Sequence, residues 1–302
     1  MRFGIMAMQI DALIPPDFPP DAPTEQMLAH IAHFDHAGLV RHLVEHGFNL
    51  IELGGDLSLF LPHTFDRNAI EHLAALKAEL GLSYTVHLPL WSVEPSTPLE
   101  TVRHGSVQAL INIIQATRIL EPEVYVLHAT GALAAEFYRM RLPEAARGLL
   151  LRQFQSGARA SLQTLLNVTD LPGRKLAIET IEFPLDLTLE LADELDLSIC
   201  FDTGHILSGF SGSLEFFEAL ERCLPRLAEI HLHDSPSIEP NQAIVYGRDH
   251  QPLGAGDLQV DRFLGRLEAA HFDGPLIFEL TVKDALASRD AIHRYSPQDL
   301  AQ

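Results

Sequence analysis

The chain has 302 residues, of which 47% are hydrophobic, and this content is enough to bury one large core. Its 41 acidic residues outnumber the 21 basic ones, and the resulting net charge of −20 repels a nucleic-acid backbone at long range. The charge excludes nucleic-acid binding by bulk electrostatics, so we expect a small-molecule substrate and no nucleic-acid partner.

The two cysteines, Cys200 and Cys223, do not form a CxxC pair, and one lies in a predicted strand, so a disulfide framework is not expected. The opening MRFGIMAMQI is too short and too uncharged for a secretory signal. No apolar run reaches the ~18 residues of a membrane span. We predict a cytoplasmic protein with no membrane partner, and a homo-oligomer is compatible with the sequence.

Strand and helix patterns alternate along almost the whole chain. A Pro-rich stretch at about 9–25 follows the first strand as a long loop, because adjacent prolines prevent a regular element there. The expected strands cover 3–7, 50–53, 83–87, 124–128, 175–180, 197–202, 227–233 and 275–280. The expected helices cover 39–46, 67–80, 99–119, 143–168, 186–195, 213–223 and 259–270, with a short last helix and a tail from 282.

This order predicts an α/β fold in which eight parallel strands close into a single (β/α)8 TIM barrel. We find no linker or sustained change of composition, so residues 1–302 are predicted to form one domain. In such barrels the chemistry lies at the carboxyl ends of the strands.

Six consecutive predicted strands, the third to the eighth, end on or near a side chain that can bind a metal. Any one strand-end histidine is more simply a capping or hydrogen-bonded polar group. Their joint occurrence at one end of a barrel predicts a site for divalent metal ions, because carboxylate and imidazole ligands suit zinc, manganese or iron. The candidate ligands are His87, His128, Glu179, Asp202, His205, His231, His250 and Glu279.

Five motifs resemble those of the xylose isomerase-like TIM barrels, the superfamily that also contains endonuclease-IV-type phosphodiesterases (AP endonuclease family 2). They are AIET (177–180), CFDTGH (200–205), HLHDS (231–235), HQPLGAGDL (250–258) and IFEL (277–280). The resemblance covers nearly the whole chain and implies the barrel fold. It leaves the reaction open, because several chemistries occur on this scaffold.

For a sugar isomerase or epimerase, the resemblance implies one divalent ion held by Glu179, Asp202, His231 and Glu279. Glu179 and Glu279 would also move the proton next to the carbonyl. For the endonuclease-IV branch it implies further ligands after the third, fourth and seventh strands, and up to three ions. His87, His128 and His250 match that second branch, which favours hydrolysis of a phosphodiester at a multinuclear centre.

One position departs from the endonuclease pattern, because Arg248 stands where that branch has an aspartate and Asp249 directly precedes His250. A third ion is therefore left open. Trp91, His233, Arg248 and Asp249 are the predicted substrate-binding residues, Trp91 through stacking on a planar group. A packed rim residue is the simpler interpretation of Trp91.

The leading hypothesis is a metal-dependent phosphodiesterase for a small or cofactor-like substrate, with Glu179 and Glu279 as the catalytic carboxylates. The superfamily includes phosphodiesterases that open the nucleotide loop of cobamides, and this acidic chain resembles them. A sugar or sugar-phosphate isomerase or epimerase is the alternative. A barrel that binds a metal or ligand without turnover is the third.

Overall fold

We analysed a computed structural model of the protein. It describes residues 1–9, 19, 22–238 and 247–295, and most of the Pro-rich stretch predicted at about 9–25 lies outside them. Eight strands occur within the described residues. They are β1 (Arg2–Met6), β2 (Leu50–Gly54), β3 (Ser83–His87), β4 (Tyr125–Leu127), β5 (Leu176–Glu179), β6 (Ser198–Asp202), β7 (Leu227–His231) and β8 (Pro275–Phe278).

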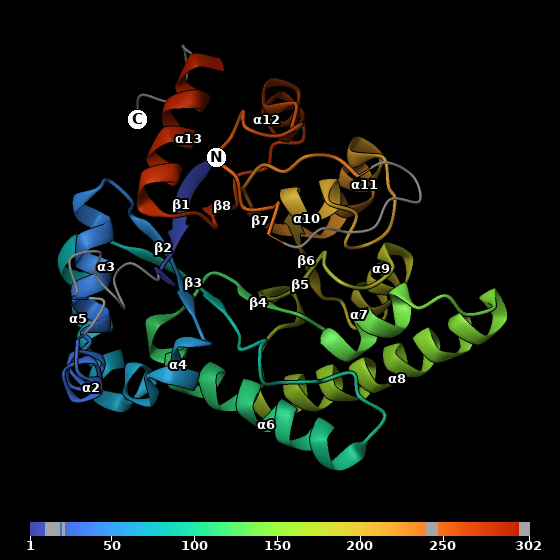
Figure 1. Ribbon diagram of the computed structural model, residues 1–302, viewed down its shortest axis with the longest axis horizontal. Helices are drawn as coiled ribbons and strands as arrows, with labels where there is room; N and C mark the ends of the chain where they lie inside the picture. Colours follow the sequence, from blue (N-terminus) through green and yellow to red (C-terminus); the bar gives the residue numbers. More distant parts are fainter. Residues whose placement is uncertain (10–18, 20–21, 239–246, 296–302) are drawn as a thin grey trace.

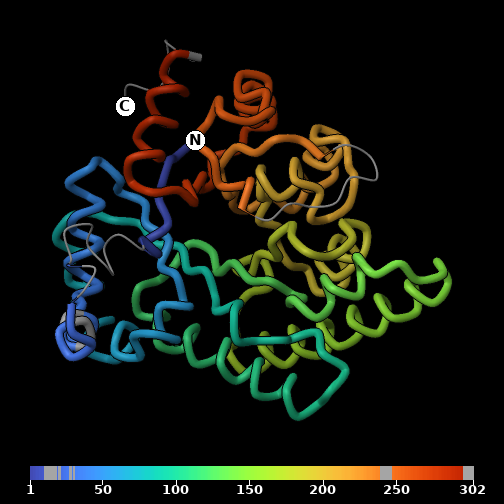
Figure 2. Tube along the Cα trace, viewed as in Figure 1, coloured from blue at the N-terminus to red at the C-terminus, as the bar shows by residue number. Residues whose placement is uncertain are grey.

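The eight strands are parallel and pair in sequence order, and β8 closes the barrel by pairing with β1. Figure 1 shows this barrel at the centre of the molecule with helices around it. The predicted (β/α)8 TIM barrel is confirmed. In the tube of Figure 2, the blue N-terminal strand β1 lies beside the orange-red part of the chain near the C-terminus, in agreement with the pairing of β1 with β8.

The helices that connect the strands form the outer layer of the barrel. The α-helices of the described residues are α2 (Thr24–Ala32), α3 (His36–Glu45), α4 (Leu57–Phe60), α5 (Arg67–Leu80), α6 (Glu100–Thr117), α7 (Ala132–Arg139), α8 (Glu144–Thr169), α9 (Leu185–Glu194), α10 (Thr203–Leu207), α11 (Phe216–Cys223), α12 (Val260–Ala269) and α13 (Val282–Tyr295). Short 3-10 helices are η1 (Pro62–Phe65), η2 (Arg118–Leu120), η3 (Gly173–Lys175) and η4 (Leu224–Arg226). In this part of the chain, no helix is both long enough and apolar enough to cross a membrane.

Apolar side chains pack on both faces of the barrel strands. The main core packs the outer faces of the strands against the helices, and large side chains such as Phe48, Tyr84 and Phe263 are fully buried. A separate small cluster of Val124, Val126, Ala177 and Cys200 belongs to strands β4 to β6 and the residue before them. Because side chains alternate along a strand, Ala177 and Cys200 lie on the same face as Glu179 and Asp202.

Candidate functional site

The carboxyl ends of β3 to β8 bring ionisable side chains together at one mouth of the barrel. Each lies at the end of its strand or in the loop that follows. Nitrogen–oxygen contacts of 3.0 to 3.6 Å connect all eight predicted ligands into one network. They are His87, His128, Glu179, Asp202, His205, His231, His250 and Glu279.

Glu179 stands at the centre of this network, and its two carboxylate oxygens face different imidazoles. Its Oε2 lies 3.1 Å from Nε2 of His87 and 3.0 Å from Nε2 of His128. Its Oε1 lies 3.0 Å from Nδ1 of His205. A carboxylate placed between two groups of nitrogen ligands has the arrangement needed to bridge two ions.

His87 ends β3 and His128 directly follows β4, and both contact Glu179. The Nδ1 atom of His87 lies 2.9 Å from the carbonyl oxygen of Leu88, to which only a protonated nitrogen can donate. The proton of the neutral ring therefore sits on Nδ1, and the lone pair of Nε2 points toward Glu179. Such a backbone partner is the usual way to orient a metal-binding histidine.

The motif Asp202-Thr203-Gly204-His205 folds locally as a capped helical turn. Oδ1 of Asp202 accepts a 2.7 Å hydrogen bond from the backbone N–H of His205, which starts α10. This turn directs Nδ1 of His205 back to Oδ2 of Asp202, at 3.1 Å. One carboxylate thus builds the turn with one oxygen and faces the candidate site with the other.

His231, the last residue of β7, is the imidazole that faces the most carboxylates. Its Nδ1 lies 3.4 Å from Glu279, 3.6 Å from Glu179 and 3.7 Å from Asp202. The residue is completely buried. A single ion held by these four side chains would have the ligand set that the resemblance implies for an isomerase.

His250 comes to the mouth on the loop after β7, which Asp234 organises. The carboxylate of Asp234 accepts backbone hydrogen bonds of 2.8 to 2.9 Å from Ser235, Gly254 and Leu258. His250 adopts a left-handed backbone with φ of 56°, which is uncommon for a residue with a side chain. Its Nε2 lies 3.3 Å from Glu279.

His233 is fully buried beneath His250, and the two rings are stacked with centroids 4.0 Å apart. The backbone N–H of His250 donates to Nδ1 of His233 at 2.9 Å, so Nδ1 carries no proton. The ring proton therefore sits on Nε2, which donates to Oδ2 of Asp202 at 3.0 Å. Although His233 lies close enough to His205 and His250 to complete a ligand group, these hydrogen bonds give it the role of orienting Asp202.

Asp249 joins the network despite its shifted position in the sequence. Its Oδ2 lies 3.0 Å from Nδ1 of His250 and 3.5 Å from Nε2 of His205. Arg248 is exposed. Trp91 is 55% exposed and packs edge-on against Phe60 with ring centroids 6.0 Å apart. Substrate binding by Trp91, His233, Arg248 and Asp249 stays a prediction.

The opposite charges within the network raise the pKa values of His87 and His250 and lower the pKa of Glu179. Burial opposes protonation of His87, but Glu179 outweighs it and raises the pKa of His87 to about 9. Burial likewise opposes protonation of His250, whereas Asp249 and Glu279 raise its pKa to about 10. Burial favours the neutral form of Glu179, but the surrounding imidazoles hold its pKa well below the usual value. A cation that replaces these imidazole protons would therefore meet carboxylates that are already ionised.

The chemistry of the donor set fits divalent ions. Ligand atoms of Glu179, Asp202 and His205 lie within 4.8 Å of one another, and so do those of His87, Glu179 and His231.

The residues that sequence reasoning missed are Glu52 and Glu229, two buried carboxylates near His231. The available signal was a charged residue in the middle of an apolar strand.

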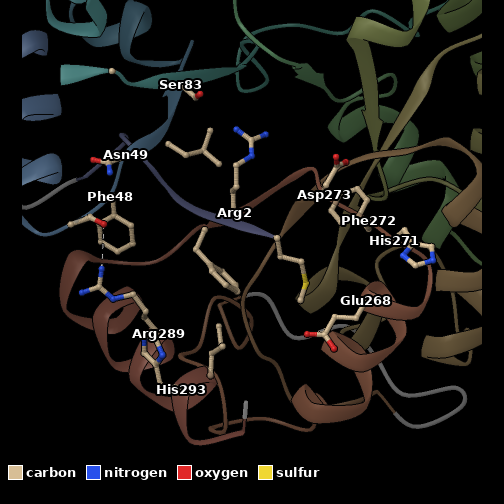
Figure 3. Close-up of a pocket in the computed structure, with 16 residues that line it drawn as sticks. Arg2, Phe48, Asn49, Ser83, Glu268, His271, Phe272, Asp273, Arg289 and His293 are labelled. Carbon is tan, nitrogen blue, oxygen red and sulfur yellow. Dashed lines mark hydrogen bonds between the residues drawn. The ribbon is translucent and has the colours of Figure 1, made fainter. Parts of the chain in front are cut away.

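The opposite end of the barrel, at the amino ends of the strands, contains a hollow of about 860 Å³, shown in Figure 3. Its two labelled arginines already have partners within the protein. Arg2 donates to the carboxylate of Glu123, and Arg289 donates to the backbone carbonyl oxygen of His46. Because its cations are already paired, this hollow has the character of a stabilising face, whereas the carboxyl ends of the strands carry the ionisable network.

Comparisons with solved structures show the same fold. A D-tagatose 3-epimerase-like protein superposes with a TM-score of 0.69 at 20% identity, over 98% of this chain and 97% of that one. The 3-keto-D-glucoside 4-epimerase YcjR from E. coli gives 0.66 at 18%, over 99% and 100%. Endonuclease IV from Thermus thermophilus gives 0.63 at 18%, over 98% of both chains. Both branches of the expected resemblance are therefore represented.

Sequence comparison adds a relative and a family. An uncharacterized protein of Methanocaldococcus jannaschii is 23% identical over 264 residues, which cover 84% of this chain and 82% of that protein. A family model described as "Xylose isomerase-like TIM barrel" matches residues 40–298. The chain therefore belongs to the xylose isomerase-like TIM barrel family (AP endonuclease 2).

Proposed function

We propose that the protein is a metal-dependent phosphodiesterase that hydrolyses a small or cofactor-like substrate at a multinuclear site. The observation that carries the proposal is the position of Glu179, whose Oε2 faces His87 and His128 while its Oε1 faces His205. A single ion would not require imidazoles near both oxygens of Glu179. Two ions bridged by Glu179 would require them.

Zinc, manganese or iron ions at this site would supply Lewis acidity toward a phosphoryl group and a lowered pKa for water. The protein's own residues would hold them. His87 and His128 would bind one ion with Glu179, and Asp202, His231 and Glu279 would surround the other. His205, His250 and Asp249 lie together as the set from which a third could be held.

The substrate class follows from the charge and the rim. With a net charge of −20, the protein repels a long polyanion, whereas a small phosphodiester can be captured locally. The exposed Trp91 ring, packed edge-on against Phe60, offers a surface on which a planar group can stack. A nucleotide-like substrate, such as the nucleotide loop of a cobamide, has both features. We infer that the protein acts in the cytoplasm.

A sugar or sugar-phosphate isomerase or epimerase is the second candidate. It is favoured by the position of His231, whose Nδ1 lies within 3.4 to 3.7 Å of Glu279, Glu179 and Asp202. A single ion in that position, flanked by Glu179 and Glu279, suits proton abstraction next to a carbonyl. The two candidates share this metal and differ in the use of His87 and His128.

Metal content together with the variant His128→Ala separates the two candidates. For a phosphodiesterase, we expect two or three divalent ions per wild-type chain by elemental analysis. His128→Ala should lose one of them, together with most hydrolysis of a bis-aryl phosphodiester. His104→Ala is the matched control, because His104 is exposed on α6 and pairs only weakly with Glu100. A single ion per chain, retained in full by His128→Ala, would return the assignment to the isomerase, which ketose turnover would then test.

A further inference from the structure

Two carboxylates lie inside the barrel beneath the candidate ligands. Glu52 is the middle residue of β2, and Glu229 is the middle residue of β7. Both are completely buried. Glu229 precedes His231 by two residues, so their side chains share the inner face of the barrel in successive layers. Burying two ionisable groups in this layer has a large cost unless they are partnered.

Their contacts form a chain across the interior. The Oγ1 hydroxyl of Thr85 in β3 donates to Oε1 of Glu229 at 3.1 Å. One oxygen of Glu229, one of Glu52 and a ring nitrogen of His231 lie within 4.8 Å of one another. Oε2 of Glu52 lies 3.3 Å from Nε2 of His231. Neither carboxylate oxygen of Glu52 makes a hydrogen bond within the described part of the chain.

Two adjacent carboxyl groups in a dry interior cannot both be ionised at a small cost, so the pair retains a proton. Glu229 accepts from Thr85 through Oε1, and its Oε2 makes no hydrogen bond within the described residues. Oε2 of Glu52 is the oxygen on the side that faces His231.

The two ring nitrogens of His231 face different groups. Nδ1 points toward Glu279, Glu179 and Asp202 at the mouth, while Nε2 points down toward Glu52. A neutral imidazole has one N–H and one lone pair. If Nε2 carries the proton and donates it to Glu52, then the lone pair of Nδ1 faces the candidate metal site.

We propose that Glu52 is a positioning residue that fixes His231 in its metal-binding orientation, and that the Thr85–Glu229 pair holds Glu52 in place. A carboxylate behind a metal-bound histidine orients the ring and strengthens it as a ligand, and its loss typically lowers metal affinity 10- to 100-fold. The inference rests on the proposed metal centre. It does not depend on whether the reaction is hydrolysis or isomerisation.

The test is the Zn²⁺ affinity of Glu52→Gln, Glu229→Gln and the wild type, measured by competition with a chromogenic chelator. Glu52→Gln replaces the carboxyl group behind His231 with an amide, so we expect about 10- to 100-fold weaker binding. Glu229→Gln should stay within about threefold of the wild type, because glutamine keeps the length of the side chain and an oxygen that can accept from Thr85. If Glu52→Gln does not fold, Glu52→Asp replaces it and is expected to weaken binding through its shorter reach.

Thermal unfolding of the chelator-stripped proteins separates positioning from general structural support. Positioning predicts that only metal affinity distinguishes the two glutamine variants. A purely structural role predicts instead that both variants melt at lower temperature without a selective loss of affinity. That outcome would overturn the proposal.

Two further outcomes would also overturn it. Unchanged Zn²⁺ affinity in Glu52→Gln would show that Glu52 does not position His231. Loss of one whole ion from both variants would show that Glu52, Glu229 and His231 bind a cation themselves. In contrast, a wild-type protein that binds no divalent ion at all would refute the proposed function as well, so the two failures are distinguishable.

Discussion

Gly204 shows how closely a single residue can control the candidate site. It lies in α10 between Asp202 and His205, and a Cβ atom at this position would lie 2.2 Å from both Cε1 and Nδ1 of the His233 ring. His233 is held between the backbone of His250 and the carboxylate of Asp202. The glycine therefore makes room for the ring that orients a predicted metal ligand.

Replacing Gly204 with alanine should displace the His233 ring. We expect Gly204→Ala to lower the free energy of unfolding by about 1–3 kcal/mol, the usual cost of overpacking. It should also weaken metal binding, because Asp202 loses its donor. Gly265→Ala is the control, since a Cβ at that position in α12 meets no atom within 4 Å. Denaturant unfolding and zinc titration of the two variants check the prediction, which fails if both behave as wild type.

The sequence identified most side chains of the network for a physical reason. Parallel strands present their carboxyl ends at one mouth, so His87, Asp202 and His231 could be grouped without coordinates. Glu52 and Glu229 could not, because strands in a parallel barrel are buried on both faces and their sequence does not show which face is inside. Only the closed barrel reveals that both carboxylates share its interior with His231.

At the scale of elements, the strands were easier to predict than the short helices. The apolar runs located all eight strands to within about two residues, which is the usual uncertainty of element ends. α4, α7 and α10 were missed because each has only four to eight residues, too few for a clear helical period. α10 matters most, since this turn places His205 in the network through contacts that a linear pattern does not show.

The loop 247–258 depends on Asp234, which receives three backbone hydrogen bonds. Asp234→Ala would leave these buried donors without a partner, at about 1–3 kcal/mol for each that stays unsatisfied. We expect faster hydrogen exchange in this loop and weaker binding of any ion that uses His250. Asp257→Ala is the control, because this carboxylate accepts one exposed hydrogen bond from Ser237. Equal exchange rates in both variants would contradict the assignment.

At the scale of the whole molecule, the network joins six of the eight strands at one mouth. Without an ion, protonated imidazoles neutralise its carboxylates, as the raised pKa values of His87 and His250 indicate. An ion ligated by these rings must displace their protons, so metal binding, folding and pH are linked. If the proposed metal centre exists, the same residues would stabilise the barrel in two ways, by ion pairs at low pH and by metal at high pH.

This linkage predicts the pH dependence of thermal stability. The folded pKa of His87, about 9, lies above its unfolded value of about 6.5, so its contribution to the metal-free protein is complete below pH 6.5 and is lost as the pH rises through 9. Zn²⁺ binding strengthens over the same range because fewer protons compete. The rise in melting temperature on adding Zn²⁺ should therefore be larger at pH 8.5 than at pH 6.5.

Scanning calorimetry with matched chelator-treated and zinc-loaded samples measures this difference directly. His104→Ala should show the wild-type trend, because His104 is exposed on α6 and lies outside the network. His128→Ala should show a smaller zinc-induced rise at both pH values, since one ligand of the proposed second ion is absent. A zinc-induced rise that is independent of pH would mean that the ion displaces no protons and that His87 and His250 are not among its ligands.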